Sequence, residues 1–134
     1  MKNEKGGVMC KGNELETRLV NFAVSVIDLT GRLPKNYTGY HILKQIIRSS
    51  SSTAANYAEA QFAESRADFL HKIKIVLKEL QETKVWLLIV HRLALIKTNQ
   101  SVEYLIGENK ELISIFVQSA KTAQKNKKKP PRTV

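Results

Sequence analysis

The chain contains no proline between Pro34 and Pro130, and the only glycines in that stretch are Gly39 and Gly107. Proline and glycine disfavour a helix interior more than any other residue, so their scarcity over such a length favours long helices. The longest apolar run, Val85 to Val90, is only six residues long, which is too short to cross a bilayer. Because the N-terminal segment also lacks the apolar stretch of a secretory signal, we expect a cytoplasmic protein.

Apolar residues recur at alternating spacings of four and three, which places them on one face of a helix. The first segment with this pattern begins after Asn13, whose side chain is a candidate N-cap. Gly31 and Pro34 end it, because the residue before a proline is pushed out of the helical region. Its predicted core face consists of Leu15, Leu19, Phe22, Val26, Leu29 and Leu33.

The second segment covers about residues 40–62 and contains four consecutive serines, Ser49 to Ser52. Serine hydroxyls compete for backbone hydrogen bonds, but apolar periodicity on both sides of the run favours a continuous helix. The third segment covers about residues 66–96. Ser65 and Asp68 form a pair resembling a capping box at its start.

The fourth segment begins near Val102 and fades into Lys-rich sequence after Ala120. Four amphipathic helices joined by short turns pack as an antiparallel up-down four-helix bundle, so the predicted fold class is all-α. We assign residues 14–124 to the bundle. Residues 1–13 are predicted to be a flexible N-terminal segment, and residues 125–134 a basic disordered tail.

The net charge of +10 is unevenly distributed. Residues 121–134 hold six basic side chains and no acidic one, whereas residues 14–120 are nearly balanced. A basic terminal segment binds phosphate groups by releasing counterions, although it can also serve solubility alone. The candidate nucleic-acid-binding residues are therefore Lys121, Lys125, Lys127, Lys128, Lys129 and Arg132.

Between Val85 and Val90 the third segment is apolar on every side, and such a helix must be buried on more than one face. Trp86 lies off the main apolar stripe, on a row with Ile89 and Leu93. Two interpretations remain open: Trp86 lies at the edge of the core, or it anchors a contact between subunits. We favour the second and expect a closed homo-oligomer with Trp86, Ile89 and Leu93 at or near the interface.

An antiparallel hairpin of the second and third segments brings a row of polar residues together. This predicted polar seam consists of Arg48, Asn56, Glu59, Glu79 and Glu82. Paired carboxylates serve acid–base chemistry or bind metal ions, but they also form structural ion-pair networks that fix helix register. We favour the structural interpretation, because Arg48 is expected opposite Glu79 with Glu82 one turn further along.

No group of residues in the chain indicates catalysis. His41, His71 and His91 are spread over different segments without metal-ligand spacing, and Cys10 has no neighbouring histidine that could act as its base. The Glu-x-x-His spacing of di-iron bundles and the glycine-rich phosphate loops are both absent from the sequence. We therefore expect no enzyme activity, and no metal, cofactor or small-molecule substrate.

Residues 46–60, which read IIRSSSSTAANYAEA, resemble the R-S-x-x-S-x-x-x-N-x-A-E-G/A signature of a bacterial four-helix-bundle family. The stretch from Ser65 to Leu87 resembles the family's next signature, most clearly at residues 77–80 (LKEL). These proteins are encoded by intervening sequences within large-subunit ribosomal RNA genes. The resemblance covers about residues 14–120, and Ala60 stands where many members have glycine.

The resemblance implies an up-down bundle that assembles as a cyclic homopentamer and has no catalytic activity. A similar bundle is the accessory subunit of diversity-generating retroelements, a basic pentameric barrel that binds nucleic acid and a reverse transcriptase. With a charge of +10 on every copy, such an oligomer would attract polyanions strongly.

The leading hypothesis is therefore a non-enzymatic oligomeric scaffold that binds nucleic acid, with structured RNA as the favoured ligand, through its basic residues. The alternative is a protein–protein adaptor without a nucleic-acid role, in which the charged tail serves solubility. The expected partners are further copies of the chain, RNA or DNA, and a partner protein, but no membrane.

Overall fold

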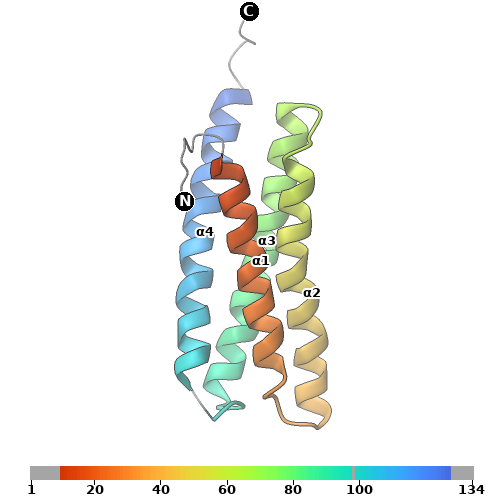
Figure 1. Cartoon of the computed structure of the whole chain (residues 1–134), viewed down its shortest axis with the longest axis vertical. Helices are drawn as coiled ribbons and strands as arrows, with labels where there is room; N and C mark the ends of the chain where they lie inside the picture. Colours follow the sequence, from red (N-terminus) through yellow and green to blue (C-terminus); the bar gives the residue numbers. More distant parts are fainter. Residues whose placement is uncertain (1–9, 98, 128–134) are drawn as a thin grey trace, which may run out of the picture.

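The computed structural model describes residues 10–97 and 99–127, and within these ranges the chain is all-α, as predicted. The described residues form four helices, shown in Figure 1: α1 (Cys10–Thr30), α2 (Tyr37–Ala60), α3 (Arg66–Arg92) and α4 (Asn99–Lys127). Over the described residues, none of the four helices combines the length and the apolar character needed to span a bilayer.

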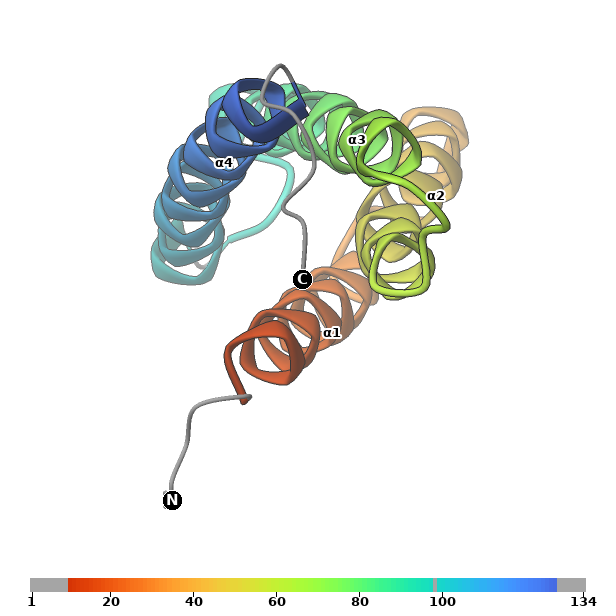
Figure 2. The ribbon, with the colours of Figure 1, turned by 90° about the horizontal axis from the view of Figure 1, so that it is seen from above.

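The connections between the helices lie at alternating ends of the bundle. The α1–α2 and α3–α4 connections lie at one end, and the α2–α3 turn lies at the other, together with Cys10 and Lys127 (Figure 1). Viewed from above, the helices follow one another around an arc with α1 and α4 at its two ends (Figure 2). The α1–α4 interface is the sparsest of the four between neighbouring helices, and α1 and α3 lie diagonally across the bundle.

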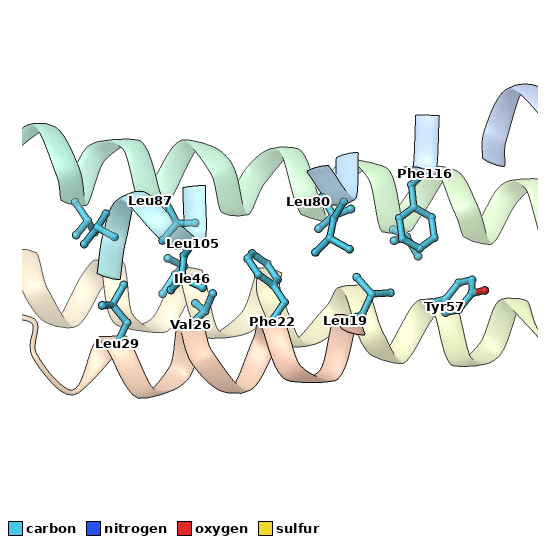
Figure 3. Packing of buried hydrophobic residues seen from close by; sticks show 14 of the residues in the cluster. Leu19, Phe22, Val26, Leu29, Ile46, Tyr57, Leu80, Leu87, Leu105 and Phe116 are labelled. Carbon is cyan, nitrogen blue, oxygen red and sulfur yellow. The ribbon is translucent and has the colours of Figure 1, made fainter. Parts of the chain in front are cut away.

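The core consists of the apolar faces that the periodicity predicts. Leu19, Phe22 and Val26 of α1 point inward toward Ile46 of α2 and Leu80 of α3 (Figure 3). Every predicted core residue of the first segment is buried except Leu15, which is half-buried.

Near the end of the bundle that holds the α2–α3 turn, two aromatic rings close the core. The Tyr57 and Phe116 rings meet edge to face with their centroids 5.3 Å apart, a favourable geometry for an aromatic pair. Burial raises the pKa of the Tyr57 hydroxyl above its ordinary value.

Three helices begin earlier than predicted: α1 at Cys10, α2 at Tyr37, and α4 at Asn99 rather than near Val102. The first, α1, already starts at Cys10, so Asn13 lies inside the helix and the prediction that it is the N-cap is wrong. In α2 the cap is Asn36, whose side-chain oxygen accepts a hydrogen bond from the Gly39 amide at 2.9 Å. Gly39 is buried, and a Cβ at this position would overlap the carbonyl oxygen of Pro34. The close approach of these two backbones requires a glycine there.

The ends of α3 show one prediction confirmed and one wrong. Ser65 caps α3 by accepting a hydrogen bond from the Asp68 amide at 3.0 Å, as predicted. The helix ends at Arg92 rather than near residue 96, because Ala94 adopts a left-handed backbone with φ of 49°. The Ala94 and Leu95 amides each donate 3.1 Å hydrogen bonds, to the carbonyls of His91 and Val90 respectively. These two bonds form a Schellman motif, which closes the helix.

The helices also extend into both predicted terminal segments. Residues 10–13 belong to α1, and residues 125–127 belong to α4 rather than to a disordered tail. Lysine and glutamine are good helix formers, and cations near a helix C-terminus interact favourably with its dipole. The remaining parts of those two segments, residues 1–9 and 128–134, lie outside the described residues.

The serine run is helical, which confirms the prediction for the second segment. The Ser51 hydroxyl donates to the Ile47 carbonyl at 2.7 Å, one turn back along α2. Ser49 and Ser50 are buried with their hydroxyls directed at carbonyls of the preceding turn. Because these small side chains satisfy their hydroxyls within their own helix, they can lie inside the bundle without unpaired donors.

Candidate functional site

Three residues of the predicted polar seam form one ion-pair cluster between α2 and α3. Arg48 Nη1 lies 3.2 Å from Glu79 Oε1, and Arg48 Nη2 donates a hydrogen bond to Glu82. These hydrogen bonds and charges raise the pKa of Arg48 above its ordinary value and hold that of Glu82 below its own. Glu79 is mostly buried, whereas half of the Arg48 side chain is exposed. Both carboxylates are thus occupied by a cation on the neighbouring helix.

The other two seam residues make separate contacts. Glu59 pairs across the hairpin with Lys72, whose Nζ lies 2.6 Å from Glu59 Oε1. Asn56 donates instead to the carbonyl and the hydroxyl of Ser52, both at 2.9 Å and both within α2. The seam is therefore two inter-helix ion-pair clusters with an intrahelical hydrogen bond between them, rather than one continuous network.

A layer of small polar side chains crosses the middle of the core. Thr83 Oγ1 of α3 lies 2.8 Å from Ser49 Oγ of α2 and also donates to the Glu79 carbonyl at 2.9 Å. Asn109 of α4 is completely buried, and neither its amide nitrogen nor its amide oxygen has a hydrogen-bond partner. These polar residues lie on the core faces of three helices, but they include no titratable group that could act as a base.

The described residues hold no candidate metal site. Across residues 10–97 and 99–127, no three His, Cys, Asp or Glu side chains gather closely enough to hold an ion. His91 Nε2 lies 3.2 Å from Glu103 and thereby links α3 to α4. His41 contacts the aromatic ring of Trp86 instead. Each of these two histidines thus has a contact that joins neighbouring helices.

All three acidic residues of α4 are paired with other helices. Glu108 and Glu111 both accept hydrogen bonds from Arg18 of α1, and Glu103 lies beside His91 of α3. Three lysines of α4 are exposed: Lys110, Lys121 and Lys125. Within the described part of the chain, no carboxylate lies within ion-pair distance of any of these lysines.

Only part of the predicted nucleic-acid site can be placed. Lys121 and Lys125 lie on the last turns of α4, and Lys127 is the last residue of that helix. Lys128, Lys129 and Arg132 lie outside the described residues. Lys110 was not among the predicted residues, although its spacing of eleven from Lys121 puts the two on the same helix face.

The predicted interface residues differ in exposure. Leu93 is 58% exposed, but Trp86 and Ile89 are half-buried and pack against the core cluster. Trp86 does not project freely, because His41 of α2 lies against its ring and its Nε1 donates to Glu82 at 3.1 Å. Sequence periodicity identifies the row but does not show that α2 supplies a side chain to cover it.

An exposed apolar stripe on α1 was missed. Val20, Val24 and Ile27 are 43%, 60% and 39% exposed. Their spacing of four and three places them on one face of α1, away from the core face. The sequence contained the signal, since these three apolar residues recur at helical spacing beside the predicted core face of the first segment. The structure therefore shows an exposed apolar face on α1, the helix diagonal to α3, in addition to the predicted row that contains Trp86.

A groove of about 1120 Å³ lies where α1, α4 and the α2–α3 turn meet. Its walls include Leu15 and Arg18 of α1, Phe69 of α3, and Ile115 and Ala123 of α4. It follows the sparse α1–α4 interface, where the first and last helices leave apolar side chains partly uncovered.

Comparison with known proteins decides the family. The family model for the 23S rRNA-intervening sequence protein matches residues 13–118, which is most of the chain. The chain belongs to this family. No curated protein matches the sequence. The family resemblance seen in the sequence is therefore confirmed.

A solved structure similar to this member of the 23S rRNA-intervening sequence family comes from Bacteroides thetaiotaomicron. It is a protein of unknown function from the S23 ribosomal protein family. The two sequences are 34% identical, the match covers 80% of this chain and 98% of that one, and the TM-score is 0.73. The similarity thus extends over nearly the whole of the solved chain, but it indicates no activity, because the function of that protein is unknown.

The range shared with the 23S rRNA-intervening sequence family includes some of the features described above and excludes others. It contains the Arg48 cluster, the polar layer and the α1 stripe. It stops before Lys121 and Lys125, so the basic end of α4 lies beyond the matched residues. Any role of those two lysines must be argued from this chain alone.

Proposed function

We propose that this protein is a non-catalytic homo-oligomeric scaffold that binds nucleic acid, with structured RNA as its first candidate ligand. The observation that carries the proposal is the division of charge on α4. Its carboxylates are paired with Arg18 and His91, whereas Lys110, Lys121 and Lys125 are exposed and form no ion pair with a carboxylate among the described residues. Exposed cations that are not held by an ion pair attract the phosphate backbone of nucleic acid.

The proposed assembly is a closed ring of antiparallel up-down bundles, with five copies as the family resemblance implies. Two separate apolar faces support a ring. Val20, Val24 and Ile27 lie exposed on α1, whereas Val85 of α3, the diagonal helix, and Leu93, its C-cap residue, are exposed as well. A contact between two different faces repeats from copy to copy and closes into a ring when the rotation allows. The alternating positions of the helix connections support the antiparallel order (Figure 1).

The nucleic-acid proposal is tested by salt-dependent binding. Anisotropy of a labelled RNA hairpin should show binding at about 50 mM salt, with affinity falling steeply as salt increases. The double variant Lys121→Gln/Lys125→Gln should weaken binding and reduce the slope of log K against log salt by about 1 for each lost phosphate contact. The control Lys35→Gln/Lys97→Gln removes the same charge from exposed lysines at the opposite end of the bundle.

Two results would reject nucleic-acid binding by the α4 lysines. One is the absence of any retention of the hairpin at about 50 mM salt, where phosphate contacts are strongest. The other is an equal loss of affinity in the two double variants. The first result would leave the protein–protein adaptor as the better hypothesis.

The assembly is tested by the mass of the particle in solution. Light scattering should give five times the 15.2 kDa of one chain. Val24→Glu/Ile27→Glu places charge in the α1 stripe and should reduce that mass. Ser25→Glu, on an exposed neighbouring position outside the stripe, should leave it unchanged. A wild-type mass of a single chain would reject the ring, and an unchanged mass in the double variant would reject the α1 face as an interface.

A further inference from the structure

An aromatic cluster, consisting of Tyr37, His41 and Trp86, lies on the outer side of α2 and α3. The Tyr37 and His41 rings stack at 18° with their centroids 6.4 Å apart. His41 in turn meets Trp86 edge-on, with centroids 5.7 Å apart and 73° between the planes. The three rings therefore form a continuous row that extends from α3 across α2 toward solvent.

The outermost ring of this row has no role in the core. Tyr37 is 85% exposed and His41 is exposed as well, whereas Trp86 at the inner end is half-buried. The Trp86 Nε1–H donates to Glu82, which itself is held by Arg48. The inner ring is thus fixed by hydrogen bonding before any ligand arrives, so less side-chain entropy is lost on binding.

Cationic side chains adjoin the cluster on α2. Lys44 is exposed three residues after His41 and four before Arg48, which puts all three on one side of the helix. Glu79 and Glu82 both pair with Arg48, and these three side chains together carry one net negative charge, which the charge of Lys44 balances. The surface therefore presents an aromatic face and an ammonium group on the same side of α2.

We propose that the aromatic cluster is a stacking site for unpaired bases of RNA, with Lys44 contacting the adjacent phosphate. This inference rests on the proposed function and names the part of the RNA that the protein recognises. Every base has a π-face, so aromatic side chains bind single strands with little dependence on sequence. A duplex hides those faces within its stack, and proteins that read RNA bases therefore bind loops and single strands.

The single tryptophan of the chain makes the site observable. Titration with a twelve-nucleotide oligouridylate at about 50 mM salt should quench Trp86 fluorescence, whereas a blunt RNA duplex of the same length should quench it less. Tyr37→Ala should weaken oligouridylate binding about 5- to 100-fold, the range expected for losing one stacked base. Tyr37→Ala should not change the salt slope, because it removes no charge.

Tyr104→Ala is the matched control. Tyr104 is 70% exposed on α4, outside the aromatic cluster. Its substitution removes an exposed tyrosine ring just as Tyr37→Ala does, but it should leave the affinity for oligouridylate unchanged. Equal affinity of Tyr37→Ala and the wild type would overturn the stacking site while leaving the lysine contacts of the proposed function in place. A wild type that binds neither RNA probe would overturn the proposed function itself.

Discussion

Arg18 of α1 contacts Glu108 of α4 at two points, with Nε 2.8 Å from Oε2 and Nη2 2.9 Å from Oε1. A third hydrogen bond joins the same guanidinium to Glu111 at 2.6 Å. Together these bonds raise the pKa of Arg18 above its ordinary value, with the hydrogen bond to Glu108 as the largest cause. The arginine thus links the first and last helices across the sparsest interface of the bundle.

Loss of this link should destabilise the protein measurably. Arg18→Met keeps the aliphatic stem but leaves Glu108, which is 18% exposed, without its cation. We expect a loss of about 1–2 kcal/mol in the free energy of unfolding, since two-point charged pairs are stronger than ordinary surface pairs. Arg32→Met removes only a 3.3 Å hydrogen bond to Ser101 and should cost less than about 0.5 kcal/mol. Equal losses in urea unfolding would contradict the role of Arg18.

The Arg48 cluster should make stability depend on pH in the acid range. The Arg48 hydrogen bond, and secondarily that of Trp86, holds the pKa of Glu82 below its ordinary value. Ionised Glu82 therefore stabilises the fold above the pKa of the unfolded chain, about 4.3, and this contribution is lost as pH falls through the lower folded pKa. Glu82→Gln should be less stable than the wild type at pH 7, and its stability should fall less steeply below about pH 4.3.

Thermal melts between about pH 2 and 7 would measure this difference. Glu64→Gln is a suitable control, because Glu64 is exposed in the α2–α3 turn and forms no ion pair within the described residues. If both variants kept the acid profile of the wild type, Glu82 would contribute nothing to it.

Two glycine-to-alanine changes should have opposite effects. Gly39→Ala drives a Cβ into the Pro34 carbonyl and should destabilise the protein by about 2–3 kcal/mol, as expected for overpacking. In Gly107→Ala the added Cβ has no neighbouring atom within 4 Å. This variant should stabilise α4 by about 0.5–1 kcal/mol, because alanine favours a helix interior more than glycine does. Unfolding midpoints in urea would show both. A Gly39→Ala variant as stable as the wild type would mean that the two backbones can separate at little cost.

Ala94→Gly should stabilise the protein. Ala94 is a non-glycine residue at a positive φ, which costs an L-residue roughly 1–2 kcal/mol. Glycine avoids that cost but loses more backbone entropy, so we expect a net gain of about 0.5–1 kcal/mol. The matched Ala55→Gly, at an exposed position within α2, should instead lose about 1 kcal/mol. A loss in both variants would show that the left-handed turn contributes no strain.

Asn109→Leu should also stabilise the protein. An unsatisfied buried amide costs about 1–3 kcal/mol, and leucine of similar size removes both unpaired atoms. Thr83→Val is the contrasting variant, because it removes a hydroxyl that already bonds to Ser49 and should cost about 1 kcal/mol. A destabilised Asn109→Leu would show that the amide is satisfied in solution, as by an internal water molecule.

Helical periodicity and the geometry of an antiparallel helical hairpin sufficed to predict most of the fold and one of the ion pairs between helices. Residues whose numbers sum to nearly the same value face each other across a hairpin. For this reason the pairing of Arg48 with Glu79 followed from the position of the α2–α3 turn. Asn56 was predicted to belong to the same seam, but its short amide reaches the Ser52 carbonyl in its own helix instead. Register determines which residues are neighbours, whereas side-chain length determines which of them bond.

The remaining differences depend on tertiary contacts. The end of α3 was missed because Ala94 gives no signal for a left-handed backbone, which in most helix caps is provided by glycine. The contact between Trp86 and His41 was not predicted, because the two residues lie more than forty positions apart in sequence. A single-helix pattern contains neither kind of information.

The two ends of the bundle differ in the parts of the chain that they contain. Cys10 and Lys127 lie at the end of the bundle that also holds the α2–α3 turn, while the opposite end consists of the other two connections. In a ring whose axis runs along the bundles, residues 10 and 127 of every copy would therefore lie on the same rim. Such a ring would have two unlike faces, one formed by the first turns of α1 and the last turns of α4, the other by the α1–α2 and α3–α4 connections.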